Sequence, residues 1–438
     1  MNTQAAIRHD QHAGVTPQSP RSVRETGLTE GFLLDLLIKT LFRQGMERPS
    51  EMSAALKLST VVIHELVEMA LAKQLVHLLG QPGANMVAEM RYQLSDKGKI
   101  WAKEALAQSS WVGAAPVPVD QFCAQVERQS VRAERLTEPA LRQVFNELVL
   151  PSELMTKIGP AVNSGASILL YGPPGNGKSS IATAVCQAFG SHVYLPHAIA
   201  IGSDVVVFFD PAVHEPVRQH GSTQATGLRR PTIQDQRYIR CVRPAVITGG
   251  ELLLEKFDMV KDPATGLYDA PLHLKAGGGL FVVDDFGRQR HTPQELTNRL
   301  IVPLESGNDH LVLENGRKVE VPFDTLVIFA TNYEPRTLMD DAGLRRLRHK
   351  ILVDRPDRKL FVKILLKTAE RSGLEINEEI LAFILFDLYG AHPQARFNAF
   401  HPRFLIDQCK SICTYQGKNP ELTPEILTQA WDNLLAAH

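Results

Sequence analysis

Residues 172–179 read Gly-Pro-Pro-Gly-Asn-Gly-Lys-Ser, which is the spacing of a loop that wraps around phosphate groups. The three glycines permit a tight backbone that points successive N–H groups at phosphate oxygens. Lys178 would reach the β- and γ-phosphates of a nucleotide, and the hydroxyl of Ser179 would hold Mg²⁺. We expect the whole loop to contact the nucleotide: Gly172, Pro173, Pro174, Gly175, Asn176, Gly177, Lys178, Ser179 and Ser180.

The elements around this loop suit the same chemistry. An apolar run at Ile168–Tyr171 predicts a buried strand before the loop, and Ser179–Phe189 predicts a helix after it. The N-terminus of that helix would add partial positive charge toward the phosphates. A Gly/Pro turn that matches by accident is the alternative, and the strand–loop–helix order argues against it. The sequence therefore predicts a site for ATP with Mg²⁺.

A second set of chemical groups follows another apolar run. Leu280–Val283 reads as a buried parallel strand and ends in Asp284 and Asp285. Acidic residues at the carboxyl end of such a strand lie where open α/β sheets bind ligands. Asp284 is expected to hold Mg²⁺, and Asp285 to orient the attacking water. The alternative is that both carboxylates serve only Mg²⁺.

A third apolar run, Thr325–Ala330, ends in Thr331 and Asn332. The Asn332 side chain would hydrogen-bond the attacking water or the γ-phosphate. One apolar run that ends in polar residues is ordinary, but three in this order after a phosphate-binding loop are specific.

These residues resemble the AAA+ ATPase family, and the resemblance spans about residues 135–438. Gly172–Ser179 match its Walker A motif, Leu280–Asp285 match Walker B, and Asn332 matches sensor 1. The family usually has Glu after the Walker B Asp, whereas this chain has Asp285. Because Asp is one methylene shorter, water activation would be slower or would need a closer approach.

The resemblance also implies roles for arginines. Arg345, Arg346 and Arg348 follow Asp340-Asp341-Ala342 and look like the segment that supplies an arginine finger to a neighbouring subunit, although the sequence does not separate them. Arg403, after His401-Pro402 at a helix start, looks like sensor 2. The alternatives are a solvated basic face and a surface arginine. A trans-acting arginine implies a homo-oligomeric ring, with a hexamer as the favoured size.

Composition narrows the class of protein further. The chain has 438 residues, a net charge of −1 and five cysteines without metal-ligand spacing. Such a balance gives no global attraction to nucleic acid or anionic membrane. Residues 1–25 are polar, and no apolar run approaches the roughly 18 residues of a membrane span. We therefore expect no membrane span and a cytoplasmic location.

The N-terminal third predicts a separate domain. Residues 1–25 are expected to form a disordered tail, and residues 26–110 to form three helices, a hairpin and a helix. That order resembles a winged helix-turn-helix. Residues 29–108 carry nine basic and nine acidic residues. Because phosphate neutralisation dominates DNA affinity, a protein client or adaptor is favoured over DNA as the partner of residues 26–110.

The remaining chain completes an α/β architecture, namely an AAA+ P-loop core of parallel strands with a C-terminal helical lid and an N-terminal winged-helix domain. We expect a linker at 111–134, the nucleotide-binding domain at 135–353 and the lid at 354–438. A β-rich insertion is expected at about 200–275. Its arginine-rich part, 229–243, is either a substrate loop or a solvated hairpin.

Two functions from different classes remain open. The first is an ATP-hydrolysing ring that remodels or moves a macromolecular client recruited through residues 26–110. The second is an ATP-switched regulator that uses the winged helix on duplex DNA. The sequence names neither the client nor the pathway. The basic turn Gly287-Arg288-Gln289-Arg290 is expected to contact substrate or to sense a neighbouring nucleotide.

Overall fold

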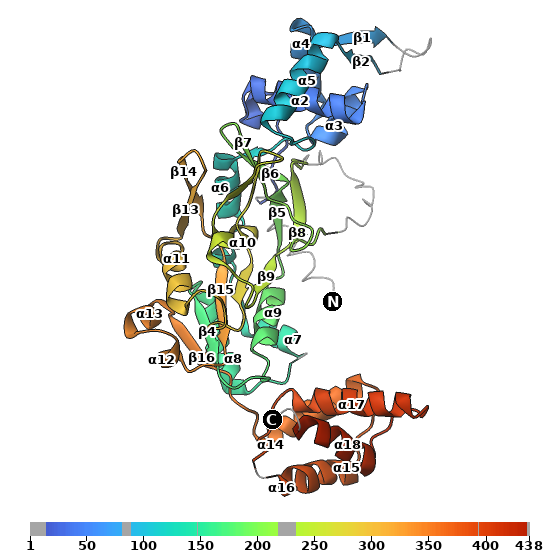
Figure 1. The fold of residues 1–438 in the computed structure, drawn as a ribbon, viewed down its shortest axis with the longest axis vertical. Helices are drawn as coiled ribbons and strands as arrows, with labels where there is room; N and C mark the ends of the chain where they lie inside the picture. Colours follow the sequence, from blue (N-terminus) through green and yellow to red (C-terminus); the bar gives the residue numbers. More distant parts are fainter. Residues whose placement is uncertain (1–14, 81–88, 147, 218–233, 393, 436–438) are drawn as a thin grey trace.

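The computed structural model describes residues 15–80, 89–146, 148–217, 234–392 and 394–435. The described chain is elongated, with N-terminal helices at one end, the sheets in the middle and the C-terminal helices at the other end (Figure 1). The predictions made for residues 1–14, for the tip of the N-terminal hairpin and for Arg229 and Arg230 lie outside the described residues.

A five-stranded parallel sheet forms the centre of the described structure. Its order is β16-β4-β15-β12-β9, and every neighbouring pair is parallel. The strands are β4 (Ile168–Tyr171), β9 (Ala245–Thr248), β12 (Leu280–Val283), β15 (Leu326–Thr331) and β16 (His349–Leu352). The inner strands are buried on both faces, which explains their nearly continuous apolar sequence. The expected α/β class is confirmed.

Helices cover both faces of this sheet. One face packs against α7 (Glu138–Phe145), α8 (Ser152–Asn163) and α9 (Lys178–Ala188). The other face packs against η3 (Leu254–Phe257), α11 (Pro293–Ser306) and α13 (Asp341–Arg346), and the short α12 (Pro335–Leu338) precedes α13. This layering leaves the carboxyl ends of β4, β12 and β15 together at one edge of the sheet.

A second, mixed sheet lies between the central sheet and the N-terminal helices (Figure 1). Its order is β10-β11-β7-β6-β3, and a separate strand pair and a hairpin share its core. The elements are β3 (Val117–Pro118), α6 (Val119–Arg128), η2 (Val131–Ala133), β5 (His192–Pro196), β6 (Ala198–Ile201), β7 (Asp204–Val207), β8 (Tyr238–Val242), β10 (Val260–Asp262), β11 (Leu267–Asp269), α10 (Leu272–Lys275), β13 (Asn308–Val312) and β14 (Lys318–Pro322).

Two expected boundaries differ from this arrangement. In place of a linker over 111–134, the chain forms β3 and α6, because Val117, Phe122 and Val126 are buried in the second sheet's core. The range 200–275 also does not coincide with the insertion. It contains β9, a strand of the central sheet, whereas β5 of the insertion begins earlier, at His192.

The N-terminal helices form their own core. Their elements are η1 (Arg24–Thr26), α2 (Glu30–Gln44), α3 (Pro49–Leu56), α4 (Thr60–Ala72), β1 (Val76–Gly80), β2 (Arg91–Leu94) and α5 (Asp96–Gln108). Thr29 caps α2 by accepting a hydrogen bond from the Phe32 amide at 3.3 Å, as the sequence suggests. The element order is the expected one, and the winged-helix interpretation stays a prediction.

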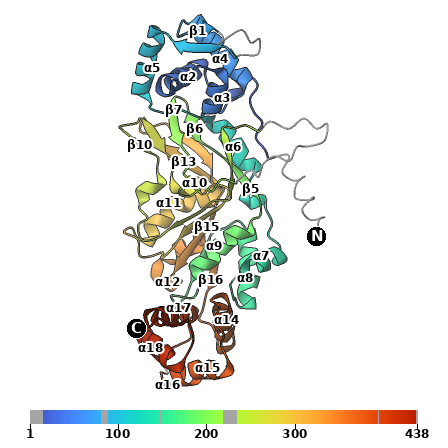
Figure 2. The ribbon, with the colours of Figure 1, turned by 90° about the vertical axis from the view of Figure 1, so that its right-hand side faces the viewer.

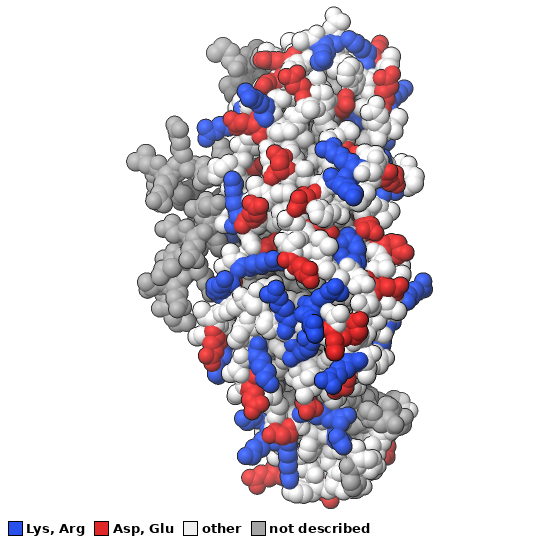
Figure 3. All heavy atoms as spheres, turned by 90° about the vertical axis from the view of Figure 1, so that its left-hand side faces the viewer, with Lys and Arg blue, Asp and Glu red and all other residues white. Residues whose placement is uncertain are grey.

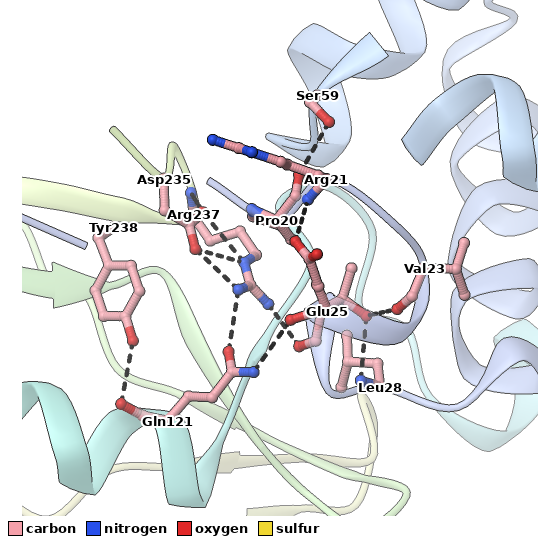
Figure 4. A network of polar contacts seen from close by, with 11 residues as sticks. Pro20, Arg21, Val23, Glu25, Leu28, Ser59, Gln121, Asp235, Arg237 and Tyr238 are labelled. Atoms are coloured by element: carbon pink, nitrogen blue, oxygen red, sulfur yellow. Dashed lines mark hydrogen bonds and ion pairs between the residues drawn. The ribbon is translucent and has the colours of Figure 1, made fainter. Parts of the chain in front are cut away.

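Residues 15–26, which we call the strap, are ordered, contrary to the disordered tail expected over 1–25. Gln18 forms a β-bridge with Gln234, and Thr26 O accepts a hydrogen bond from Arg237 Nη1 at 3.0 Å. Figure 4 shows the strap between the N-terminal helices and the second sheet. Because Val23 is buried, the strap is anchored by apolar as well as polar contacts.

The C-terminal helices form a fourth core. They are α14 (Arg358–Arg371), α15 (Glu378–Ala382), the π-helical η4 (Phe383–Leu388), α16 (Tyr389–Ala391), α17 (His401–Tyr415) and α18 (Pro424–Leu435). They gather at one end of the molecule, next to α8 and β16 (Figure 2). Among the described residues, no helix has the length and apolar character needed to cross a membrane.

Candidate nucleotide site

The phosphate-binding loop joins β4 to α9. At Gly172, φ is +135°, and a Cβ atom would overlap the carbonyl oxygen of Val353, so only glycine fits. Gly177, at φ +85°, precedes the first residue of α9. The loop amides therefore lie at a helix N-terminus, which favours an anionic ligand.

Lys178 lies inside this loop, with a side chain that is largely buried. Its ammonium donates hydrogen bonds to Gly172 O and Pro173 O, both at 2.9 Å. Burial lowers the pKa of Lys178, and the nearby carboxylates of Asp284 and Asp285 oppose that shift. The lysine thus lies next to the acidic groups that the sequence predicts for the same site.

Ser179 and Asp284 meet across the site. Ser179 Oγ donates to Asp284 Oδ2 at 2.6 Å, and the Asp284 amide donates to Thr248 O of β9 at 2.7 Å. A hydroxyl and a carboxylate side by side are oxygen ligands of the kind that Mg²⁺ takes alongside phosphate and water. These two residues fit the metal expected from the sequence.

Asp285 and Asn332 also meet, as their positions after β12 and β15 suggest. Asn332 Nδ2 donates to Asp285 Oδ1 at 3.2 Å, and both side chains are accessible to solvent. Asp285 has φ +47°, a left-handed conformation that costs roughly 1–2 kcal/mol for most non-glycine residues and less for Asp. The carboxylate is therefore aimed by an unusual backbone conformation.

The C-terminal helices close the other side of the loop. A pocket of about 600 Å³ lies between them and is lined by Gly175, Asn176, Phe400 and Arg403, among others. The Ala399 amide donates to Asn176 Oδ1 at 3.0 Å. Arg403 is 83% exposed, with its Nε 3.5 Å from Asp407 Oδ2. Arg403 thus faces the pocket that contains the phosphate-binding loop.

The other expected arginines lie elsewhere. Arg345, Arg346 and Arg348 line a pocket of about 530 Å³ together with Arg132 and Glu305. Arg346 Nε is 4.0 Å from Glu305 Oε1. Figure 3 faces the side of the molecule that carries α11 and α13, and basic side chains gather there in one group. Arg345 also lines a second pocket with Tyr171, the last residue of β4, but no residue of the phosphate-binding loop lines either pocket.

Two arginines of 229–243, Arg237 and Arg243, are buried, so they belong neither to a substrate loop nor to a solvated hairpin. Arg237 is 2% exposed and pairs with the equally buried Asp235 at 2.8 Å. Arg243 is also buried, and its Nη2 lies 3.1 Å from both Glu134 Oε2 and Gln129 O. Both arginines hold elements together, because burial of a guanidinium requires such partners.

Sequence reasoning missed one buried residue of the site. Gln289 lies in the turn after β12, and its Nε2 is 3.0 Å from Asp284 O, 3.3 Å from Asp285 O and 3.2 Å from Gly249 O. In the sequence, Gln289 is marked only by its place in a basic turn. That turn was interpreted from its two arginines, not from the glutamine between them.

Residues 168–219, which begin with β4 and include the loop and α9, match the model of the ATPase family associated with various cellular activities (AAA). This segment of the chain is an AAA ATPase domain. Residues 357–433, which form the C-terminal helices, match a domain of unknown function (DUF8689).

Comparisons over the whole chain give remote likenesses. No curated protein matches it in sequence. Among solved structures, it is similar to NtrX from Brucella abortus, with a TM-score of 0.37 and 15% identity over 76% of this chain and 60% of NtrX. It is also similar to the Thermotoga maritima RuvB Holliday junction branch migration motor, with a TM-score of 0.38 and 14% identity over 67% of this chain and 73% of RuvB. The match thus spans less than two thirds of the NtrX chain.

Proposed function

We propose that this chain is a ring-forming ATPase that uses ATP and Mg²⁺ to remodel or move a macromolecular client. The client is recruited through residues 26–110. One observation carries the proposal: two charged sites lie on different parts of one subunit. The first is the phosphate-binding loop with its carboxylates, and the second is the arginine pocket.

The phosphate-binding loop and the carboxylates have different roles in hydrolysis. Lys178 binds the β- and γ-phosphates, while Ser179 and Asp284 hold Mg²⁺, which supplies neutralisation of phosphate charge. Asp285 and Asn332 orient a water molecule toward the γ-phosphorus. The water oxygen bonds to phosphorus, its proton passes to Asp285, and the bond to the β-phosphate oxygen breaks to release ADP.

The arginine pocket supports a role between subunits. Its lining includes residues 164–167, which precede β4, whereas the phosphate-binding loop follows β4 at the opposite end of that strand. Among the described residues that line it, none belongs to the loop, and Asp284, Asp285 and Asn332 are not among them. Because β16 is an edge strand and α13 leads into it, these arginines are open to a neighbouring subunit's nucleotide.

The lid position supports a second contribution within the subunit. Arg403 lines the same pocket as Gly175 and Asn176, at the start of α17. We assign it to the phosphates of the nucleotide bound by its own subunit. Movement of the C-terminal helices would then report whether nucleotide is bound.

A protein client fits residues 26–110 better than DNA does. Helix α4, which a winged helix would place in the major groove, contains no Lys or Arg. The strap also contacts its N-terminal half: Ser59 Oγ donates to Pro20 O at 3.1 Å, and the Val23 amide donates to Glu65 Oε2 at 2.8 Å. A groove-reading surface would need both cationic side chains and free access.

Light scattering with a slowly hydrolysed ATP analogue tests the ring. We expect a nucleotide-dependent oligomer and an ATPase rate per subunit that rises with protein concentration. A monomer at all concentrations, with a constant specific rate, would refute the assembly. Anisotropy titration against duplex DNA over a salt series tests the alternative, since a DNA-binding regulator would show tight, strongly salt-dependent binding.

A further inference from the structure

Gln289 has an unusual set of partners for a glutamine in a turn. Its Oε1 accepts a hydrogen bond from the Gly287 amide at 2.9 Å, which fixes the orientation of the side-chain amide. The Nε2 group then faces three carbonyl oxygens, those of Gly249, Asp284 and Asp285. The residue is 9% exposed, so it has few competing contacts with water.

The carbonyls that it contacts belong to the two catalytic carboxylate positions and to the end of a neighbouring strand. Gly249 follows β9 directly, and Asp284 and Asp285 follow β12. One side chain therefore joins the backbone on both sides of the Asp284–Asp285 step to the adjacent strand.

Asp285 needs such support because of its backbone. Among the described non-glycine residues, Lys57, Gln74 and Asp285 have positive φ. Lys57 and Gln74 follow the ends of α3 and α4, where left-handed residues are common. Asp285 instead follows a strand, so its conformation must be maintained by surrounding contacts.

The neighbouring contacts fix the flanks of Asp285 and leave its own carbonyl to Gln289 and the turn. The Phe286 amide donates to Ala330 O at 2.7 Å, and Thr331 Oγ1 donates to Phe286 O at 2.7 Å. Asp285 O accepts from the Arg288 amide at 2.9 Å and from Gln289 Nε2. Loss of the Gln289 amide would therefore free the peptide whose rotation redirects the Asp285 carboxylate.

We propose that Gln289 is a positioning residue for hydrolysis, which holds the Asp285 carboxylate toward the attacking water by tying its backbone to Asp284 and to the end of β9. This inference rests on the proposed role of Asp285. It predicts a specific loss of turnover, because the hydrogen bonds of Gln289 go to backbone groups that follow β9 and β12 and not to the phosphate-binding loop.

Two substitutions separate the amide donors from other properties of the side chain. Gln289→Glu keeps the shape and the acceptor for Gly287 but loses the donors, and Gln289→Met is uncharged and loses both. We expect each to lower kcat by roughly 10- to 100-fold, since a small misplacement of a catalytic group has this effect, while the Kd for ADP stays within about twofold. Gln93→Glu, on the exposed side of β2, makes the same chemical change away from the site as a control.

A double-mutant cycle then tests whether Gln289 acts through Asp285. In an Asp285→Asn background, Gln289→Met should cause no further loss of kcat. A full additional loss of kcat in the double variant would overturn the proposal, and so would a normal kcat in Gln289→Met. A loss of kcat confined to Gln289→Glu would also overturn it, because that result would indicate charge repulsion. Should Gln289→Glu fail to fold, Gln289→Met alone decides, with its melting temperature measured beside the wild type.

The same cycle distinguishes this proposal from the proposed function. If Asp285→Asn alone turns over at the wild-type rate, the assignment of Asp285 is wrong whatever Gln289 does. If Asp285→Asn retains only a small residual rate and Gln289→Met is fully active, the assignment of Asp285 stands and the inference about Gln289 fails.

Discussion

Lys178 and Asp285 lie in the same site, but they act on different charges. The Lys178 ammonium lies in the loop that we propose for the phosphates, which are already charged in the ground state. Asp285 is paired with Asn332 at the open side of the site, where water enters. Replacing Lys178 should therefore impair nucleotide binding, whereas replacing Asp285 should impair the hydrolytic step.

We predict that Lys178→Ala abolishes ATP binding, whereas Asp285→Asn binds ATP and blocks turnover down to a small residual rate. The first change removes ground-state charge neutralisation, and the second removes the group that accepts the proton from water, which is worth about 10²–10⁴-fold in rate. Calorimetric titration with a slowly hydrolysed analogue and a steady-state ATPase assay measure the two steps. Wild-type turnover by Asp285→Asn would contradict the assignment.

The sequence predicts these residues because each belongs to a local pattern. Ser179, Asp284 and Asn332 each follow a recognisable strand or loop, and parallel strands bring their carboxyl ends together. Gln289 and Arg237 could not be assigned in this way. Their partners are backbone carbonyls and side chains from distant segments, and such pairings leave no periodic signal in the sequence.

At the level of elements, the contact between the phosphate-binding loop and the C-terminal helices is made by few groups. Asn176, 5% exposed, accepts from the Ala399 amide and donates to Pro173 O at 3.2 Å. Phe400 covers Gly175 so closely that a Cβ there would overlap its ring. The loop and the start of α17 are thus packed as one unit.

We predict that Asn176→Ala weakens nucleotide binding more than it slows turnover. Loss of one buried hydrogen bond between loop and lid should cost about 1 kcal/mol, or roughly a fivefold rise in the Kd for ADP, with kcat within about twofold. Asn433→Ala removes an exposed lid asparagine and serves as the control. Equal Kd values for Asn176→Ala and wild type would show that the contact does not support the bound state.

The element boundaries were less accessible to sequence reasoning than the motifs. Val117 and Phe122 lie near Gly- and Pro-rich residues that suggest a linker, yet they are buried against the second sheet. The strap is mostly polar and lacks periodicity, and its partners include Glu65, Gln125 and Gln234, all distant in sequence. Composition reports local preference, whereas these segments are ordered by contacts distant in sequence.

At the level of the whole molecule, the arginine pocket predicts complementation between subunits. Arg345→Ala or Arg346→Ala should bind ATP normally and lose about 10³-fold or more in hydrolysis if that arginine acts in trans. Mixing such a variant with Lys178→Ala should restore activity, since mixed interfaces pair an intact loop with an intact arginine. The assay is steady-state ATPase across mixing ratios.

A flat baseline, with both parents assembled, would reject the trans role for that arginine. If the arginine is only a solvated surface charge, its alanine variant should hydrolyse ATP normally before any mixing, because removal of such a charge costs under about 0.5 kcal/mol.

The strap predicts a coupling between the N-terminal helices and the second sheet. Arg237→Met removes the partner of Asp235 and the donors to Thr26 O and Gln121 Oε1 (Figure 4). Breaking a buried ion pair costs about 3–5 kcal/mol, so we expect a lower melting temperature and faster proteolytic cleavage within the strap.

Arg21→Ala, which removes an exposed arginine of the same strap, is the matched control and should change neither property. Identical cleavage rates for Arg237→Met and wild type would mean that the strap is held by its apolar contacts alone.

The strap also constrains the order in which the chain can fold during synthesis. Thr26 and Arg237 are 211 positions apart, so the N-terminal helices leave the ribosome long before the residues that hold the strap in place. At typical translation rates this interval is roughly 10–40 s. Throughout it, Val23 and Pro20 can contact their own helices, but Thr26 O and Gln18 lack their partners Arg237 and Gln234. Attachment of the N-terminal helices to the second sheet is therefore a late event, timed by the emergence of β8.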